Sequence, residues 1–324
     1  MNSATPSRPS TLTVAIALLI VYVVWGSTYL AIAIVVETLP PLLSAGLRFG
    51  VAGTFMIGAL AAHARLRRRE PLERPTRAHW RSAFIIGALL LLGGNGGVVM
   101  AEQFIGSGVA AVLVATVPIW LAVFDAVFRR RRPSGLVIGG LVAGIAGVGV
   151  LLAPVEGIGA PDPLGVGLVM FAAISWAAGS LYARRAALPR SQLLGTGMEM
   201  LAGGIVLVVA GALIGEIGRT DVAAFSLRSL VALAYLAVFG SLVAFTAYSW
   251  LLANVPVSTV GTYAYVNPIV AVALGAVILS EPVTPRTLVA TAIIIGAVVA
   301  MVSGRPRETE EPGPVPEAAP LEAD

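Results

Sequence analysis

The chain alternates between long apolar segments and short polar stretches that carry most of its charge. A helix needs roughly 20 mostly apolar residues to cross a bilayer, and ten segments are of about that length. They cover residues 12–35, 42–62, 82–102, 107–127, 134–152, 164–184, 192–214, 229–251, 257–279 and 286–303. This pattern predicts an all-α integral membrane protein with ten transmembrane helices.

The first apolar segment resembles a signal peptide only in part. Arg8 precedes it, but the apolar run continues from Leu12 to Val36, and no small-x-small cleavage site follows. A signal-peptide core is shorter than this run. We therefore expect an uncleaved first span, preceded by a cytoplasmic tail at residues 1–11.

The arginines between the segments predict the orientation. All 21 basic residues are Arg. With a cytoplasmic N-terminus, 17 fall in inside segments, three outside and one, Arg48, within a span. Inside loops of membrane proteins are enriched in Arg, so both termini are expected in the cytoplasm. Topogenic charge, rather than substrate binding, is the expected role of these clusters.

Composition narrows the function classes. Apolar residues make up 57% of the 324 residues and charged residues 12%, and the mean hydropathy is +0.91. Soluble domains carry about 25% charge, so a soluble enzyme is excluded. There is no Cys, and the two His, His63 and His79, share one Arg-rich loop. Metal sites, cofactors and nucleic-acid partners are not expected. The segment 304–324, with five Pro and six acids, is predicted to be a disordered cytoplasmic tail.

Matched residues about 150 positions apart indicate an internal repeat. The pairs are Trp25 with Trp176, Arg48 with Glu199, Pro118 with Pro268 and Gly147 with Gly296. The repeats would occupy residues 12–152 and 164–303, with five spans each. Because five is odd, the two repeats would enter the membrane in opposite orientations, as in inverted-repeat secondary transporters.

Several motifs resemble those of a known family. They are Val24-Trp-Gly-Ser-Thr-Tyr-Leu30, Leu39-Pro-Pro-Leu-Leu-Ser-Ala-Gly-Leu-Arg-Phe49, Ser107-Gly-Val-Ala-Ala-Val-Leu-Val-Ala-Thr-Val-Pro118, Tyr265-Val-Asn-Pro268 and Glu281-Pro282. Together the chain resembles the EamA family of the drug/metabolite transporter superfamily over residues 12 to 303. The resemblance implies ten helices in two inverted five-helix repeats, a bacterial inner-membrane location and export of small metabolites or drugs.

Two charges lie deep in predicted spans. Arg48 follows Pro40 by eight residues, which places it about 12 Å into the membrane at 1.5 Å per residue. Glu199 is its repeat mate. An unpaired Arg at that depth costs at least roughly 2.5–3.5 kcal/mol. The pair is interpreted either as part of a substrate cavity or as a structural ion pair. In the first case Glu199 would carry a coupling proton and Arg48 would modulate it or bind an anionic group.

An aromatic and amide set is the second candidate for the substrate cavity. Its members are Trp25, Asn95, Trp176, Tyr248, Tyr263, Tyr265 and Asn267, while Trp120 and Trp250 sit at span ends as an interfacial belt does. Polar faces inside a span must point away from lipid. A cavity of aromatic and a few polar groups suits small amphipathic ligands, and plain helix packing is the alternative.

Helix-breaking residues and terminal carboxylates complete the candidates. Pro118 and Pro268 fall about twelve residues into their spans and predict kinks, either gating or static. The glycines around Asn95 favour close packing or a local unwinding. The acidic residues at span ends, Glu37, Glu102, Glu281 and Asp125, are interpreted as solvated caps, with Glu102 closest to the external mouth.

The sequence therefore predicts a secondary transporter that works by alternating access on a small-molecule substrate within the lipid bilayer. No Walker A sequence appears, which leaves a proton or solute gradient as the energy source. A sugar-nucleotide or lipid-intermediate carrier is the alternative within transport, and an integral membrane enzyme or receptor is the alternative from another class. Substrate, direction and a monomeric or homodimeric state stay open.

Overall fold

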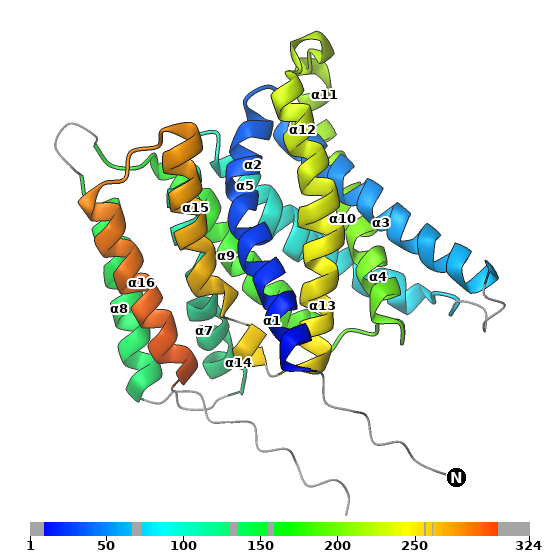
Figure 1. Ribbon diagram of the computed structural model, residues 1–324, viewed down its shortest axis with the longest axis horizontal. Coiled ribbons are helices and arrows are strands. Elements are labelled where there is room, and N and C mark those ends of the chain that lie inside the picture. The colour runs from blue at the N-terminus through cyan, green and yellow to red at the C-terminus, as the bar shows by residue number, and fades with distance from the viewer. Residues whose placement is uncertain are drawn as a thin grey trace, which may run out of the picture.

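The computed structural model describes residues 10–66, 73–129, 135–154, 159–255, 257–260 and 262–303. These residues form an all-helical bundle (Figure 1). The tails predicted at the two ends of the chain lie outside them, apart from Ser10 and Thr11. So do several of the arginines used for orientation, namely Arg8, Arg67, Arg68, Arg69, Arg130, Arg131, Arg132, Arg305 and Arg307.

Eight helical segments are long and apolar enough to cross a membrane. They are Thr11–Val36, Pro41–Leu66, Arg77–Ala101, Ser107–Phe124, Gly135–Leu152, Pro163–Ala183, Gln192–Leu213 and Leu227–Leu251. Two further apolar helices, α15 (Tyr263–Leu279) and α16 (Pro285–Ser303), follow the eighth. The continuous runs are α3 (Pro41–Leu66), α8 (Gly135–Leu152), α9 (Pro163–Ala183) and α10 (Gln192–Leu213). All ten predicted segments are helical, and the all-α prediction is confirmed.

The remaining long segments change helix type along their length. The first runs through α1 (Thr11–Ile20), η1 (Val21–Trp25) and α2 (Gly26–Val36). The third comprises α4 (Arg77–Ile86), η2 (Gly87–Gly96) and α5 (Gly97–Ala101). The fourth is split into α6 (Ser107–Val114) and α7 (Val117–Arg129), and the eighth comprises α12 (Leu227–Tyr235), η4 (Leu236–Val243) and α13 (Ala244–Asn254). The ninth begins with α14 (Val257–Val260).

The elements η1, η2 and η4 are π-helical, with a wider turn than an α-helix. π-helical turns are rare and frequent at functional sites. η2 contains the glycines around Asn95, and it lies in the third segment of the first half, whereas η4 lies in the third segment of the second half. The local unwinding favoured for the glycine-rich stretch thus takes the form of a π-helix. Its counterpart η4 was not predicted.

Side-chain caps fix where several helices begin. The Asp162 carboxylate accepts hydrogen bonds from the backbone N–H groups of Leu164 and Gly165 at the start of α9. Ser191 caps α10 and Ser226 caps α12 in the same way. Caps of this type satisfy backbone donors that have no partner inside the helix. The two short helices between α10 and α12, α11 (Glu216–Arg219) and η3 (Val222–Ala224), were not predicted.

The helices pair across the two halves in a reciprocal way. α3 packs against α10, and α8 packs against α16, so each of these helices contacts the one in the same position of the other half. The first segment packs on α12 and η4, while α9, the first of the second half, packs on η2 and α5. Figure 1 shows α8 and α16 side by side at one edge of the bundle and α3 toward the other.

Glycines bring α3 and α10 into backbone contact. A Cβ atom on Gly53 would lie 2.5 Å from the Leu201 nitrogen, and one on Gly204 would lie 2.5 Å from the Gly50 nitrogen. No side chain fits in such a space. Small residues at a helix interface allow the close van der Waals packing that drives association of membrane helices. The α3–α10 contact therefore depends on these glycines.

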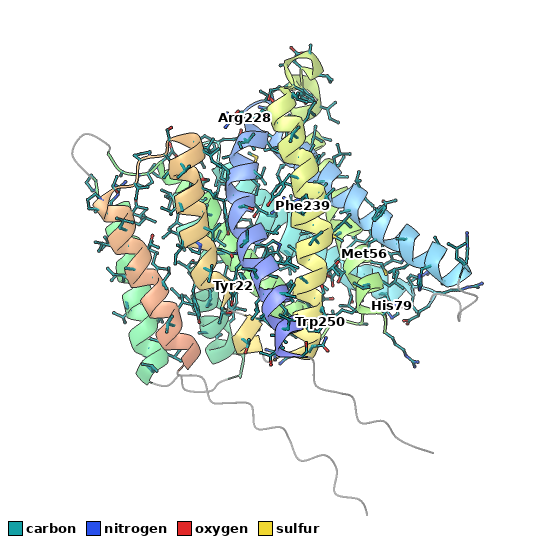
Figure 2. The ribbon with its side chains drawn as sticks, viewed as in Figure 1. Tyr22, Met56, His79, Arg228, Phe239 and Trp250 are labelled. Atoms are coloured by element: carbon teal, nitrogen blue, oxygen red, sulfur yellow. The ribbon has the colours of Figure 1, made fainter. Side chains whose placement is uncertain are left out.

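We call the end of the bundle where α2, α10 and α15 finish the upper end, and the opposite end the lower end. Arg228 lies at the upper end, and Tyr22, His79 and Trp250 lie toward the lower end (Figure 2). The described arginines separate in the same way. Arg219 and Arg286 also belong to the upper end. The arginines of the lower end are Arg65, Arg74, Arg77, Arg81, Arg129, Arg184, Arg185 and Arg190.

Candidate functional site

A central cavity lies between the two halves of the chain. Its volume is about 100 Å³, several times the space that one water molecule needs. Its aromatic and polar lining consists of Trp25, Thr28, Tyr29, Arg48, Phe49, Asn95, Trp176, Phe245, Tyr263 and Asn267. Gly94 of η2 and apolar residues of α2, α5, α6, α7, α9 and α15 complete the wall. Both halves therefore supply the surface that a ligand would contact.

Trp25, at the end of η1, is the centre of an aromatic cluster. Its ring centroid lies 4.8 Å from that of Tyr248, 5.3 Å from Tyr263, 5.5 Å from Phe245 and 6.5 Å from Trp176. Three of these contacts are edge-to-face, an arrangement that aromatic pairs prefer because of their quadrupoles. The repeat mates Trp25 and Trp176 thus meet at the cavity, on helices far apart in sequence.

The cluster is anchored to the π-helical segments. The Trp25 indole nitrogen donates to the Gly240 carbonyl oxygen in η4 at 3.2 Å. On the other side, the Ser175 hydroxyl, next to Trp176, donates to the Leu89 carbonyl oxygen in η2 at 2.7 Å. Each half therefore places a donor from its first segment on the π-helix of the other half. These bonds satisfy buried polar groups, and the first also fixes the orientation of the Trp25 ring.

Arg48 of α3 is buried at the wall of the cavity, with 4% of its surface exposed. Its Nε donates to the Ser241 hydroxyl at 2.9 Å, and its guanidinium carbon lies 4.4 Å from the centre of the Phe49 ring. No ion pair joins Arg48 to Glu199 among the described residues. The contacts with Ser241 and Phe49 are a hydroxyl bond and a cation–π contact. They leave the net charge of Arg48 unneutralised beside the cavity.

Glu199 of α10 does not line the cavity. It is partly buried and interacts electrostatically with Tyr248. Tyr248 contacts the Trp25 ring but, like Tyr265 of α15, is absent from the lining. The structure thus places Arg48 at the cavity and its repeat mate behind the wall, and the role of this pair as a site stays a prediction.

The two amide side chains at the cavity differ in how they are satisfied. The Asn267 nitrogen, in the orientation that satisfies its neighbours, donates to the carbonyl oxygens of Tyr22 and Tyr263 at 3.2 Å each. The Asn95 side-chain oxygen is buried and accepts no hydrogen bond from the described residues. Asn267 therefore holds η1 and α15 together, whereas Asn95 presents a free acceptor at the cavity wall.

The two prolines occupy different positions in their helices. The helix of the fourth segment ends at Val114 and begins again at Val117, so Pro118 is the second residue of α7. This is a position at which a missing N–H costs nothing. Pro268 lies inside α15 and lines the cavity. The predicted kink near Pro118 is thus an interruption of the helix, and any role in gating stays a prediction.

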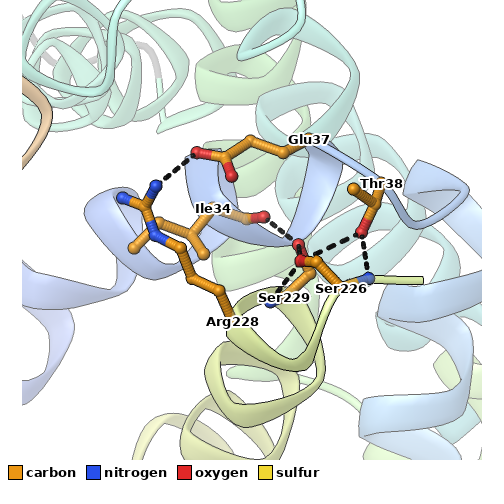
Figure 3. Close-up of polar contacts among 6 residues, drawn as sticks. All are labelled: Ile34, Glu37, Thr38, Ser226, Arg228 and Ser229. Atoms are coloured by element: carbon orange, nitrogen blue, oxygen red, sulfur yellow. Dashed lines mark hydrogen bonds and ion pairs between the residues drawn. The ribbon is translucent and has the colours of Figure 1, made fainter. Parts of the chain in front are cut away.

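Polar contacts connect the two halves at the upper end of the bundle. Figure 3 shows the Ser229 hydroxyl donating to the Ile34 carbonyl oxygen at 2.7 Å and the Ser226 N–H donating to the Thr38 hydroxyl at 3.2 Å. Glu37 and Arg228 form an ion pair at 3.5 Å. Glu37 is exposed, as expected for a solvated cap.

Two other carboxylates at the upper end bind helix N-termini. Glu216 accepts hydrogen bonds from the backbone N–H groups of Leu42 (3.0 Å) and Leu43 (2.8 Å) at the start of α3. Glu281 accepts from Ser107 (2.8 Å) and Gly108 (3.1 Å) at the start of α6. A helix N-terminus attracts negative charge through its free N–H groups and its dipole. Each carboxylate therefore ties the second half to the first.

These contacts revise the interpretation of the span-end acids. Glu281 is a half-buried inter-half clamp rather than a solvated cap. Glu102 is buried, with 8% of its surface exposed, because α5 packs against α2 and α9. The side chain of Asp125 lies outside the described residues. Sequence reasoning did not single out Glu216, since a Glu beside a loop arginine gives no sign of a distant helix that it caps.

Sequence reasoning also missed four members of the lining, namely Thr28, Tyr29, Phe49 and Phe245. Thr28 and Tyr29 belong to the Trp-Gly-Ser-Thr-Tyr motif, and Phe49 follows Arg48 directly. The motif could have indicated them, because residues three and four positions after Trp25 share its helix face. No comparable signal in the sequence marks Phe245.

An apolar helical bundle with an internal cavity lined by both halves is typical of a membrane transporter, and the comparisons agree. The profile of the EamA-like transporter family matches the chain twice, over residues 12–153 and 163–303. The chain therefore belongs to the EamA-like transporter family and is a multi-pass membrane protein. Family and relatives indicate a transporter rather than an enzyme.

Curated relatives share this length and arrangement. The chain is 40% identical over 292 residues to "Uncharacterized inner membrane transporter YedA" of Escherichia coli K12, covering 89% of this chain and 90% of the relative. It is 25% identical over 286 residues to "Uncharacterized transporter YvbV" of Bacillus subtilis, with 88% and 90% covered. A solved structure described as "Crystal structure of protein" superposes with a TM-score of 0.61 at 20% identity, covering 91% and 96% of the two chains. That likeness concerns the fold alone.

Proposed function

We propose that this protein is a secondary transporter that exports small amphipathic molecules, metabolites or drugs, by alternating access. The main observation in support is the central cavity, which lies between the two halves and is lined by aromatic residues of both. Its lining combines ring faces with a few polar groups, which suits ligands that have a flat apolar part and a hydrogen-bonding part. A cavity at the interface of two halves can be opened to either side when the halves rock against each other.

The proposed architecture is ten spans in two inverted repeats at residues 12–152 and 164–303. Three observations support it. The family profile matches twice, each matched region holds five apolar helical segments, and the helix contacts are reciprocal between the halves. Because five spans reverse the direction of entry, the halves would be related by an axis in the membrane plane.

The proposed location is the bacterial inner membrane with both termini in the cytoplasm. The name of the Escherichia coli relative supports the membrane. The separation of the described arginines between the two ends, with eight toward the lower end and three at the upper end, supports a cytoplasmic lower end. Reporter fusions at Arg74, Arg131, Arg185 and Arg305 should report the cytoplasm, and fusions near Pro161 and Asp221 the periplasm. A periplasmic signal from Arg131 would exclude the ten-span arrangement.

The cavity wall favours this proposal over its rivals. A carrier of phosphorylated cargo needs several cations, and Arg48 is the single cationic residue among the lining residues. A hydrolytic or group-transfer enzyme usually activates its nucleophile with a general base, and the described lining residues include no Asp, Glu, His or Cys for that role. The residues proposed to contact substrate are Trp25, Arg48, Asn95, Trp176, Tyr263 and Asn267. Glu199, Tyr248 and Tyr265 are proposed as residues that support them from behind the wall.

Intrinsic fluorescence offers a direct test of the cavity. Purified protein is titrated with amino acids, nucleosides and cationic drugs, and ligands that quench Trp emission are then assayed for counterflow in proteoliposomes without ATP. Quenching should disappear in the double variant Trp25→Phe with Trp176→Phe and persist in Trp80→Phe, since Trp80 of α4 lies outside the lining. Counterflow unaltered in the double variant would reject the cavity as the site, and chemical conversion of the ligand would indicate an enzyme.

A further inference from the structure

Glu102 is a buried carboxyl group for which the described residues provide no hydrogen-bond donor. It follows the last residue of α5 at the upper end, and 8% of its surface is exposed. Both of its carboxylate oxygens are buried, and neither accepts a hydrogen bond from any described residue. An ionised carboxylate in that condition carries a large desolvation cost. No part of the cavity or of the inter-half clamps accounts for it.

Two titratable groups from neighbouring elements interact with Glu102. Glu281, after α15, belongs to the second half, and its carboxylate raises the electrostatic cost of a charge on Glu102. Tyr29 of α2 also interacts electrostatically with Glu102, and Tyr29 is part of the cavity lining. Glu102 therefore interacts electrostatically both with a residue of an inter-half clamp and with a residue of the cavity wall.

Within the part of the chain that the structure describes, the elements packed on α5 bring no compensating cation to Glu102. α5 packs against α2, α3, α9 and η2. The Arg48 guanidinium of α3 is directed to Ser241, and the other basic residues of α3, His63 and Arg65, are in its last turn at the lower end. η2 has no titratable side chain, and Tyr182 is at the lower end of α9. Asp162, the cap of α9, uses its carboxylate on Leu164 and Gly165.

Two nearby carboxyl groups without a cation between them cannot both ionise cheaply. The charge on Glu281 is stabilised by two N–H donors of α6, whereas a charge on Glu102 has none. Glu102 lies just outside the apolar segment Arg77–Ala101. Burial raises the pKa of its carboxyl, and the neighbouring carboxylate of Glu281 raises this pKa further. This conformation therefore favours the protonated form of the Glu102 carboxyl.

We propose that Glu102 is a proton-binding site of the carrier and that the proton it takes up from the upper end is the one exchanged for exported substrate. The proposal rests on the proposed transport function and assigns its coupling ion. Release of this proton through the cavity to the lower end leaves a carboxylate beside Glu281, and the repulsion weakens the hold of Glu281 on α6. Because α6 also lines the cavity, loss of this proton favours opening of the upper end. Rebinding of a proton restores the clamp.

Infrared titration of the protein in nanodiscs, with no substrate present, tests the site directly. The absorption of protonated carboxyl groups is followed in wild type and in Glu102→Gln. Wild type should retain a protonated carboxyl component at about pH 7, where exposed glutamates are ionised, and Glu102→Gln should lack it. Glu37→Gln, at the exposed carboxyl of the same end, is the matched control and should keep it. Glu102→Asp should keep a protonated component with a shifted midpoint.

Three outcomes would overturn the proposal. In the first, the spectra of Glu102→Gln and wild type superpose at every pH. In the second, the protonated component persists in Glu102→Gln and is missing in Glu199→Gln, which would assign the proton to Glu199. In the third, addition of Na⁺ at constant pH removes the component, which would identify a metal cation as the occupant. Should the infrared component behave as expected while no ligand shows counterflow, the proton site stands and the transport proposal fails.

Discussion

Glu216 and Glu102 lie at the same end of the bundle and are about equally buried, at 5% and 8% exposure, yet their surroundings are opposite. Glu216 receives two backbone N–H donors from α3, and Glu102 receives none from the described residues. The comparison shows that burial alone does not define the state of a carboxyl group. A helix N-terminus makes a buried charge favourable, whereas its absence makes the same group a proton acceptor.

The comparison also separates structural from functional acids. Glu216 and Glu281 join the second half to helices of the first half and so stabilise one relative position of the halves. Glu102 contributes no such bond in this position. Removal of an acid of the first kind should lower the stability of the folded protein. Removal of an acid of the second kind should instead change how that stability depends on pH.

The largest expected effect is for Glu216→Ala. Two buried N–H groups at the start of α3 would lose a charged acceptor, and each unsatisfied donor costs about 1–3 kcal/mol. We expect a loss of roughly 2–4 kcal/mol, measured as a lower thermal midpoint in detergent. Glu102→Gln is the matched variant. We expect its free energy of unfolding near neutral pH to stay within roughly 1 kcal/mol of that of wild type. Equal losses of stability in the two variants would contradict the distinction between the helix-capping acid Glu216 and Glu102.

Glu281→Ala should have an intermediate effect. Its carboxylate also caps a helix, but it is half-buried, so water replaces part of the lost acceptor. We expect a loss of about 1–2 kcal/mol in the same assay. The substitution also removes the negative charge beside Glu102, so the infrared component of Glu102 should ionise at a lower pH. An unchanged midpoint of that component would show that Glu281 does not act on Glu102.

The pH dependence of stability sharpens the comparison. The pKa of Glu102 is raised in the folded protein, so above the ordinary Glu value of about 4.3 the unfolded chain binds fewer protons there than the native one. Stability then falls as pH rises from about 4.3 toward the raised pKa. Glu102→Gln should remove this decrease, and Glu37→Gln should not. A thermal midpoint followed across pH gives the measurement, and parallel wild-type and Glu102→Gln curves would contradict it.

The smallest effect is expected for the surface pair of Arg228 and Glu37. The two side chains are 52% and 40% exposed and 3.5 Å apart, and exposed ion pairs contribute roughly 0–1 kcal/mol. Arg228→Ala should lower stability by less than about 0.5 kcal/mol and lose that effect in high salt. A larger loss would indicate that the contacts of Figure 3 hold the halves together as the buried carboxylates do.

Length and hydrophobicity determined most of the fold in advance. Ten apolar segments could be placed within a few residues, because a helix is the only open-ended structure that satisfies its own backbone inside a bilayer. The pairing of Trp25 with Trp176 was visible as a repeat, and the two rings do meet. The extents of the π-helical turns and of the break before Pro118 were not predictable in detail, and neither were the long-range contacts at these turns, such as that of Trp25 with Gly240.

The sequence by itself determined that the chain crosses a membrane, that it consists of two related halves and that Trp25 and Arg48 lie deep within it. These properties follow from composition and spacing along single helices. Only the tertiary structure decided which charged residues matter together. Glu199, the repeat mate of Arg48, lies behind the cavity wall, while Glu216 and Glu281 cap helices 173 and 174 residues away. The environment of a carboxyl group depends on donors from distant segments, and a linear pattern carries no record of them.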